Sequence, residues 1–146
     1  LLVGAARKFT DCEFTFVGTS ELPVDVQIPE NVKLVPFANA ETLRKLYSEH
    51  EFYMQLSISE GFPNAICEAM LCGCIPIASN VAALPKIVDT CGYILEQRSL
   101  DELILVIERA LSSSNSPEKC RMHIIEKFPF EKRERDLLKA IKKQLD

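Results

Sequence analysis

The chain contains 146 residues, of which 47% are hydrophobic, with 17 Lys plus Arg against 21 Asp plus Glu. This composition is typical of one globular domain and excludes a disordered tail or a fibrous protein. The net charge of -4 provides no overall basic field, so we expect no nucleic-acid partner. Because the sequence begins with Leu1 rather than Met, we expect a single domain, 1–146, that belongs to a longer protein.

Short apolar strands alternate with amphipathic helices along the chain. Asn39 is a candidate N-cap for the second predicted helix, and Gly73 fits the position after the end of the third. The pattern predicts, in chain order, helix 1–9, strand 13–18, loop 20–30, strand 32–37, a helix after residue 39, strand 52–58, helix 64–72, strand 75–78, helix 84–88, strand 92–95 and helices near 99–111, 118–126 and 131–145. Because some strands are apolar throughout, we predict an α/β fold with one doubly wound, Rossmann-like parallel sheet and helices on both faces.

Six cysteines lie in apolar or helical stretches, at positions 12, 67, 72, 74, 91 and 120. They lack the paired C-x-x-C spacing of structural zinc sites, so we interpret them as buried, reduced thiols. A redox or metal-binding pair of Cys72 and Cys74 is the alternative. Reduced thiols indicate a reducing compartment, and no apolar run reaches the length of a membrane helix. We therefore expect a cytoplasmic location, with attachment to the inner face of a membrane as a further option.

The loop between the third strand and the helix that follows carries the most informative chemistry. Ligands of open parallel sheets bind beyond the carboxyl ends of the strands, where Glu60 and Gly61 are expected. Gly61 would let the backbone approach a ligand closely. The amides of Asn64, Ala65 and Ile66 at the helix start would offer donors to an anion such as a diphosphate. The Asn64 side chain is also a candidate N-cap for this helix.

The segment 59–79, with the sequence SEGFPNAICEAMLCGCIPIAS, closely resembles the donor-site signature of the group 1 (family 4) retaining glycosyltransferases. Glu60 and Glu68 have the spacing of that family's E-x7-E motif. The order of the surrounding strands and helices is also similar over about residues 1–111. Two glutamates at this spacing would be a weak signal alone, but the residues around them make it specific.

The resemblance implies the C-terminal, nucleotide-sugar-binding half of a two-domain enzyme of the GT-B fold, without the first strand of that half. Glu60 would be the catalytic residue, facing the transferred sugar and stabilising developing positive charge. Glu68 would accept hydrogen bonds from the ribose hydroxyls. The family pattern also implies that donor-binding residues lie around the diphosphate and the base: Gly61, Phe62, Asn64, Ala65, Ile66, Pro36 and Phe37.

The implied reaction is transfer of a hexosyl-type sugar from a nucleoside diphosphate, with retention of configuration, to a polysaccharide or lipid-linked acceptor. We expect no metal or other cofactor, because helix amides and cationic residues upstream of Leu1 would neutralise the diphosphate. The N-terminal acceptor-binding domain and that cationic loop are absent from this sequence. We therefore expect the chain alone to bind nucleotide weakly and to transfer no sugar. The alternative is a non-catalytic nucleotide-binding or interaction domain of the same fold.

Several other polar residues have ordinary interpretations. His50 and His123 match no catalytic position of the family and are expected at a helix end or on the surface. Ser79 and Asn80 either contact the donor or form a turn. The stretch 81–83, Val-Ala-Ala, stands where the family often has two glycines, and its larger side chains would narrow the site. The segment 131–145 predicts an amphipathic helix, either solvated or in contact with a lipid acceptor or the missing half.

Overall fold

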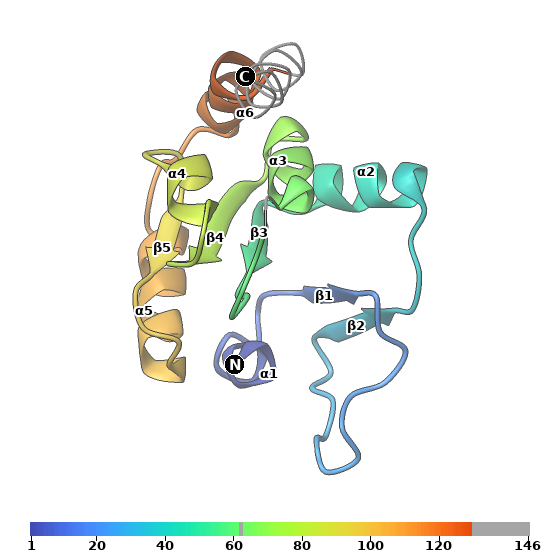
Figure 1. Cartoon of the computed structure of the whole chain (residues 1–146). Coiled ribbons are helices and arrows are strands. Elements are labelled where there is room, and N and C mark those ends of the chain that lie inside the picture. The colour runs from blue at the N-terminus through green and yellow to red at the C-terminus, as the bar shows by residue number, and fades with distance from the viewer. Residues whose placement is uncertain (62, 130–146) are drawn as a thin grey trace, which may run out of the picture.

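A computed structural model describes residues 1–61 and 63–129 of the chain, which form an α/β fold (Figure 1). The helices are α1 (Leu2–Lys8), α2 (Ala40–Glu49), α3 (Asn64–Leu71), α4 (Leu84–Val88), α5 (Leu100–Leu111) and α6 (Pro117–Lys127). The strands are β1 (Phe14–Val17), β2 (Val32–Val35), β3 (Phe52–Gln55), β4 (Ile75–Ser79) and β5 (Tyr93–Leu95). The predicted helix 131–145 lies outside the described residues.

Among the described residues every strand pair is parallel, as the alternation of strands and helices predicts, but these strands form two sheets rather than one. β1 pairs with β2, and β3, β4 and β5 form a second sheet with β4 at its centre. The pairing Phe14 with Val32 sets the register of the first sheet, and Phe52 with Ile75 that of the β3–β4 pair. Figure 1 shows β1 and β2 set apart from the larger sheet, with β3 as the strand that faces them.

β4 is the centre of the fold, because all five of its residues are buried. Its second residue, Pro76, has no N–H to donate, which normally excludes proline from a central strand. The Asn80 amide donates to the Leu95 carbonyl in β5, and every second residue of a strand directs its N–H group to the same neighbouring strand. The backbone nitrogen of Pro76, which has no hydrogen, therefore faces β5 as well. β5 begins opposite Ile77, one residue later. The proline therefore removes no hydrogen bond from the sheet.

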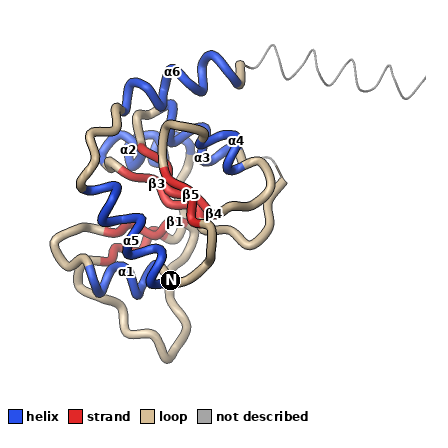
Figure 2. The backbone as a smooth tube through the Cα atoms, turned by 90° about the vertical axis from the view of Figure 1, so that its left-hand side faces the viewer, coloured by secondary structure: helices blue, strands red, loops and turns tan. Residues whose placement is uncertain are grey.

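Helices flank the strands, and Figure 2 shows α3 and α4 on one side of them and α5 on the other. Two hydrophobic clusters result. One joins α3, α4 and α6 to β4, and its largest members include Ile66, Met70 and Ile87. The other joins α1 and α5 to β1, β4 and β5, around Ile77 and Leu103. This arrangement confirms the predicted helices on both faces.

Two of the three predicted helix caps are confirmed. The Asn39 side chain accepts a hydrogen bond from the Thr42 amide at 2.9 Å, and Gly73 follows α3 with a φ of +98°. The predicted cap at Asn64 is wrong. Pro63 is the N-cap of α3, because its backbone is extended (φ -79°, ψ 102°) while Asn64 is already helical.

The six cysteines are free thiols, and the predicted burial applies to three of them. Cys74, Cys91 and Cys120 are buried, whereas the other three are half-exposed. Burial raises the pKa of Cys74 to about 12, so this thiol is inert near neutral pH. No helix in the described ranges is both long and apolar enough to cross a bilayer.

Candidate functional site

Glu60 lies beyond the carboxyl end of β3, where parallel sheets bind their ligands. Its Oε1 accepts hydrogen bonds from Ser57 Oγ at 2.5 Å and from Gln55 Nε2 at 2.7 Å. The bond from Ser57, and then that from Gln55, holds the pKa of Glu60 below its usual value, because both stabilise the ionised form. The side chain is partly exposed. Glu60 is therefore a fixed carboxylate that a ligand can reach.

Tyr53 completes this network from inside β3. Its hydroxyl donates to Gln55 Oε1 at 3.2 Å, which leaves the Gln55 amide nitrogen directed at Glu60. Burial, with a smaller contribution from nearby negative groups, raises the pKa of Tyr53 and keeps the hydroxyl protonated. Tyr53, Gln55 and Ser57 are not among the residues predicted for the site from the sequence. The signal was available, since polar side chains ending an apolar strand mark the ligand edge of a parallel sheet.

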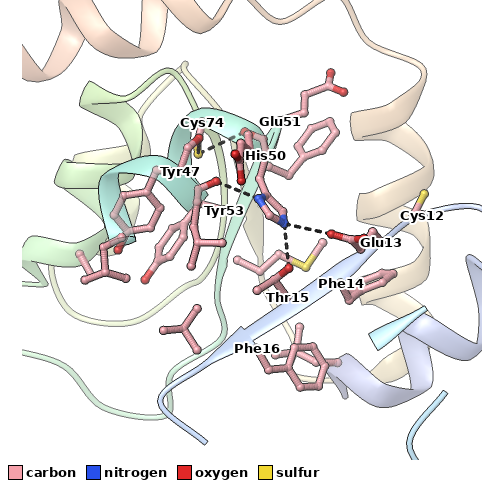
Figure 3. Close-up of a pocket in the computed structure, with 18 of the residues that line it drawn as sticks. Cys12, Glu13, Phe14, Thr15, Phe16, Tyr47, His50, Glu51, Tyr53 and Cys74 are labelled. Atoms are coloured by element: carbon pink, nitrogen blue, oxygen red, sulfur yellow. Dashed lines mark hydrogen bonds and ion pairs between the residues drawn. The ribbon is translucent and has the colours of Figure 1, made fainter. Parts of the chain in front are cut away.

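Glu68 is exposed on α3, and its charge acts, as that of Glu60 does, on the Tyr53 side chain. Glu68 adds to the burial that raises the pKa of Tyr47 and of Tyr53, and Glu60 contributes at Tyr53 too. The two tyrosine rings pack edge to face, with centroids 5.6 Å apart and planes at 88°, and Figure 3 shows them side by side. The two carboxylates of the motif therefore both act on Tyr53, one member of this aromatic pair.

The amino end of α3 lies close to Glu60 in the sequence and begins without a capping side chain among the described residues. The amides of Asn64, Ala65 and Ile66 belong to the first helical turn, which has no acidic side chain. Ile66 itself is buried in the core, so only its amide is suited to a ligand. A Cβ atom added at Gly61 would meet nothing within 4 Å, so open space lies beside this backbone. Phe62, also predicted for the site, lies outside the described residues.

The predicted base-binding residues lie in the other sheet. The strand predicted over 32–37 ends at Val35, so Pro36 and Phe37 form the loop after β2 rather than part of the strand. Both are exposed, with 80% of Phe37 accessible. In the described part of the chain no hydrogen bond or ring contact joins them to Glu60 or its partners. The structure thus groups Glu60, Gly61 and the α3 amides more closely than these two residues.

Three residues follow or end β4 and β5 and lie, like Glu60, at the carboxyl ends of the strands. Arg98, after β5, donates from Nε to the Leu56 carbonyl at 3.2 Å and brings a positive charge to the end of β3. Ser79 Oγ is buried without a hydrogen-bond partner in the described ranges. Asn80 donates to Glu96 at 2.6 Å, which supports its role in the turn. Within residues 1–61 and 63–129, no group of three His, Cys, Asp or Glu side chains is arranged to hold a metal.

Within the described residues, neither histidine shares a hydrogen bond with this network. His50 caps the carboxyl end of α2, where Nδ1 bonds to the Leu46 carbonyl at 2.8 Å and Nε2 to Thr15 Oγ1 at 2.9 Å. His123, on α6, contacts the ring of Phe128 with centroids 6.0 Å apart, and its Nε2 is buried. The helix-end prediction is confirmed for His50, whereas His123 is half-buried rather than on the open surface.

A cavity of about 750 Å³ lies between β1 and β3 (Figure 3). Among the predicted site residues that the structure describes, Ala65 alone lines it. Glu60 itself does not line the cavity, but Tyr53 of its hydrogen-bond network does, so the cavity adjoins the surface around Glu60 and the amino end of α3. Its walls are mainly apolar side chains of the strands and of α2 and α5.

Comparisons with known proteins agree with the predicted fold and family. O-antigen chain mannosyltransferase B of Escherichia coli is 29% identical over 84 residues, which are 58% of this chain and 22% of that protein. A protein described as a glycosyltransferase, ORF330 of Acidianus filamentous virus 2 (isolate Italy/Pozzuoli), is 31% identical over 120 residues, or 72% of this chain and 35% of that protein. The chain thus spans less than half the length of either relative.

The solved structure of sucrose-phosphate synthase from Thermosynechococcus elongatus resembles the chain with a TM-score of 0.79 at 20% identity, over 99% of this chain and 41% of that protein. This likeness confirms the predicted Rossmann-like half of a GT-B fold. A sequence profile of the family described as glycosyl transferases group 1 matches residues 5–127. Because that match covers most of the chain, the chain belongs to the group 1 glycosyl transferases.

Proposed function

We propose that the chain is the domain of a retaining glycosyltransferase that binds the nucleotide-sugar donor. The observation that carries this proposal is the position of Glu60. It is a reachable carboxylate held ionised by Ser57 and Gln55 at the ligand edge of the sheet, directly before a helix with an uncapped amino end. A carboxylate beside an anion-binding helix end suits a ligand that combines a sugar with a diphosphate.

Each predicted residue has a role in this proposal. Glu60 faces the transferred sugar and stabilises the positive charge that develops at its anomeric carbon. Glu68 accepts hydrogen bonds from the ribose hydroxyls. The amides of the first turn of α3, with Gly61 and Phe62 before them, bind the diphosphate, and Arg98 adds positive charge at the same edge. Pro36 and Phe37 lie against the base. We propose that this charge stabilisation proceeds without a bound metal.

The activity of the whole protein belongs to the same proposal. The donor sugar is a hexosyl-type unit, its configuration is retained, and the acceptor is a polysaccharide or a lipid-linked glycan. The name of the Escherichia coli relative, a mannosyltransferase of O-antigen chains, supports this class of acceptor. We place the protein in the cytoplasm, at the inner face of a membrane where the acceptor is lipid-linked. The acceptor-binding half lies on another part of the polypeptide.

A calorimetric titration of the chain with UDP, GDP and ADP tests the donor site. One nucleotide is expected to bind, weakly, and Glu68→Ala is expected to weaken it at least about tenfold, since a charge-assisted bond contributes roughly 1.5–3 kcal/mol. Glu108→Ala is the matched control, because Glu108 is an exposed glutamate on α5, away from the site. Equal losses from the two variants would contradict the ribose contact.

The same titration separates the enzyme from the non-catalytic alternative. A glycosyltransferase is expected to bind nucleotide in a way that depends on Glu68 and is unaffected by Glu60→Gln. The Glu60→Gln substitution is also expected to abolish turnover by the full-length enzyme. Binding without any sugar transfer by the full-length protein would favour a nucleotide-binding domain instead. Retention is tested by the anomeric configuration of the product, read by proton NMR before it mutarotates.

A further inference from the structure

Glu60 is held by the protein through one of its two carboxylate oxygens. Ser57 Oγ and Gln55 Nε2 both donate to Glu60 Oε1, at 2.5 and 2.7 Å. Among the described residues no hydrogen bond reaches Glu60 Oε2. Both donors lie at the end of β3 or directly after it, so the protein fixes Oε1 from the side of the strand. Oε2 is therefore the oxygen that is left for a ligand.

The Gln55 side chain can donate to Glu60 in one orientation only. A side-chain amide has a donating nitrogen and an accepting oxygen, and the reverse orientation would place Gln55 Oε1 against the carboxylate. In the observed orientation Gln55 Oε1 accepts a hydrogen bond from the Tyr53 hydroxyl at 3.2 Å, in a part-buried place. Without that donor the amide oxygen would lose its partner. The Tyr53 hydroxyl therefore stabilises the orientation in which Gln55 donates to Glu60.

The Tyr53 hydroxyl remains a donor because its pKa is high. Burial raises this pKa most, and the neighbouring groups Tyr47, Glu60, Glu68 and Cys74 raise it further, so the hydroxyl stays protonated near neutral pH. A donor at one end of a hydrogen-bonded chain polarises the amide and strengthens the next bond. The effect of Tyr53 thus reaches Glu60, although these two side chains share no hydrogen bond in the described part of the chain.

Ser57 reaches Glu60 by a separate route. It lies three residues before Glu60, and its hydroxyl donates to the carboxylate directly. Within the described ranges it shares no hydrogen bond with Tyr53 or Gln55. The positive charge at this end of β3 belongs to Arg98, which donates to a backbone carbonyl and not to the carboxylate. Tyr53 and Gln55 therefore act in series on Glu60, and Ser57 acts in parallel with them.

We propose that Tyr53 is a positioning residue for glycosyl transfer, which acts through Gln55 to fix Glu60 Oε1 and to leave Oε2 facing the transferred sugar. This inference rests on the role of Glu60 proposed above. A carboxylate that stabilises developing positive charge must be ionised and must keep its free oxygen directed at the anomeric carbon. The fixed direction of the hydrogen-bonded chain from Tyr53 to Glu60 supplies both conditions.

The first test is a carbon-13 NMR titration of the Glu60 carboxyl in the Tyr53→Phe variant, which removes the hydroxyl and keeps the ring. The bond from Gln55 is then weakened, so the pKa of Glu60 is expected to rise. Tyr47→Phe is the matched control, because it removes a hydroxyl from the other ring of the same edge-to-face pair. The control is expected to leave the titration of Glu60 unchanged, since the Tyr47 hydroxyl is not part of the chain from Tyr53 to Glu60.

Double variants distinguish the two routes to Glu60. In a Gln55→Ala background Tyr53→Phe is expected to have no further effect on the pKa of Glu60, whereas in a Ser57→Ala background it is expected to keep its effect. A pKa that does not respond to Tyr53→Phe overturns the proposal. So does a response that persists without Gln55, or an equal response to Tyr47→Phe, because Tyr53 would then act through the packing of the ring pair.

Sugar transfer by the full-length protein is the second test. Tyr53→Phe is expected to lower kcat about five- to tenfold with KM nearly unchanged, as for the loss of one hydrogen bond that matters in the transition state. The acidic limb of the kcat profile is expected to move to higher pH, because Glu60 must be ionised. Tyr47→Phe is expected to change neither quantity. A lower kcat without movement of the acidic limb overturns the proposal, since it would show a structural role alone.

The two tests separate this inference from the proposed function. If the full-length protein transfers no sugar while the pKa of Glu60 responds as expected, the proposed function fails and the control of Glu60 by Tyr53 through Gln55 is supported. If sugar is transferred and the pKa of Glu60 does not respond to Tyr53→Phe, the proposed function stands and the positioning role of Tyr53 is overturned.

Discussion

Glu60 has its charge state set by two side chains rather than by burial. Ser57 lies three residues before it and Gln55 five residues before it, and both donate to the same carboxylate oxygen. Tyr53 orients the Gln55 amide from within the strand. The role of these residues is to hold Glu60 in place, since they reach it directly or through one another.

The first prediction concerns the Ser57→Ala variant. Ser57 donates the hydrogen bond that lowers the pKa of Glu60 most, so its removal should raise this pKa toward the usual range, and Gln55→Ala should raise it less. A carbon-13 NMR titration of the Glu60 carboxyl measures this value directly. Because the pKa of Glu60 is lower in the folded state than in the unfolded state, ionised Glu60 stabilises the fold at a pH above its unfolded-state pKa. This contribution to stability is lost as the pH falls through the folded-state pKa. An unchanged titration in Ser57→Ala would show that the contact does not persist in solution.

The strands show that an apolar run in the sequence predicts a strand but not the residue at which the strand ends. The run predicted as the third strand extends to Ile58, yet β3 ends at Gln55, and Ile58 is 75% exposed. The second strand likewise ends at Val35, two residues short of the prediction. A strand continues only while a neighbour accepts its hydrogen bonds, and the partner strand sets that limit. Helix starts are better predicted, because a cap such as Asn39 acts within its own turn.

The turn between α4 and β5 carries the second prediction. Asp89 has φ 46° and ψ -124°, and the Cys91 amide donates to the Val88 carbonyl at 2.9 Å, which is a type II′ arrangement that favours glycine. Asp89→Gly is expected to stabilise the fold by about 1 kcal/mol, as relief of strain exceeds the entropy gained by the unfolded chain. Urea unfolding measures the change. Thr90→Gly, at a residue with ordinary φ, should be destabilising, and equal effects at the two positions would contradict the argument.

At the scale of the molecule, two sheets are held together by helices and by a few polar contacts. α1 packs against α5 and connects the β1–β2 pair to the core that contains β4. The Asn31 side chain, just before β2, donates to the carbonyls of Ala6, Phe9 and Cys12 at 2.8–3.0 Å. One amide group thus ties the end of α1 to the starts of β1 and β2.

The third prediction follows from that contact. Asn31→Ala should destabilise the protein by about 1–3 kcal/mol, because it leaves carbonyl groups without a donor in a partly buried place. Asn80→Ala is the control, since its side chain makes one exposed bond to Glu96, and it should change stability by less than about 0.5 kcal/mol. Urea unfolding of both variants makes the comparison. If the two variants lose similar amounts of unfolding free energy, the Asn31 hydrogen bonds contribute no more to stability than the exposed bond of Asn80.

The sequence by itself determined the order and type of the elements, the parallel α/β class, the family and the place of Glu60 and the α3 amides. These properties depend on residues within a few positions of one another: the period of apolar side chains, a cap and its amide, and the signature around the motif. Only the tertiary structure decided that the strands form two sheets, that the helix cap is Pro63, and that Gln55 and Tyr53 support Glu60. It also decided where the cavity between β1 and β3 lies. The two sheets and the cavity depend on which strand lies beside which, and that is set by contacts between residues far apart in the chain. The cap at Pro63 and the support of Glu60 are local contacts, but they depend on the path of the backbone after β3, which the period of apolar side chains does not specify.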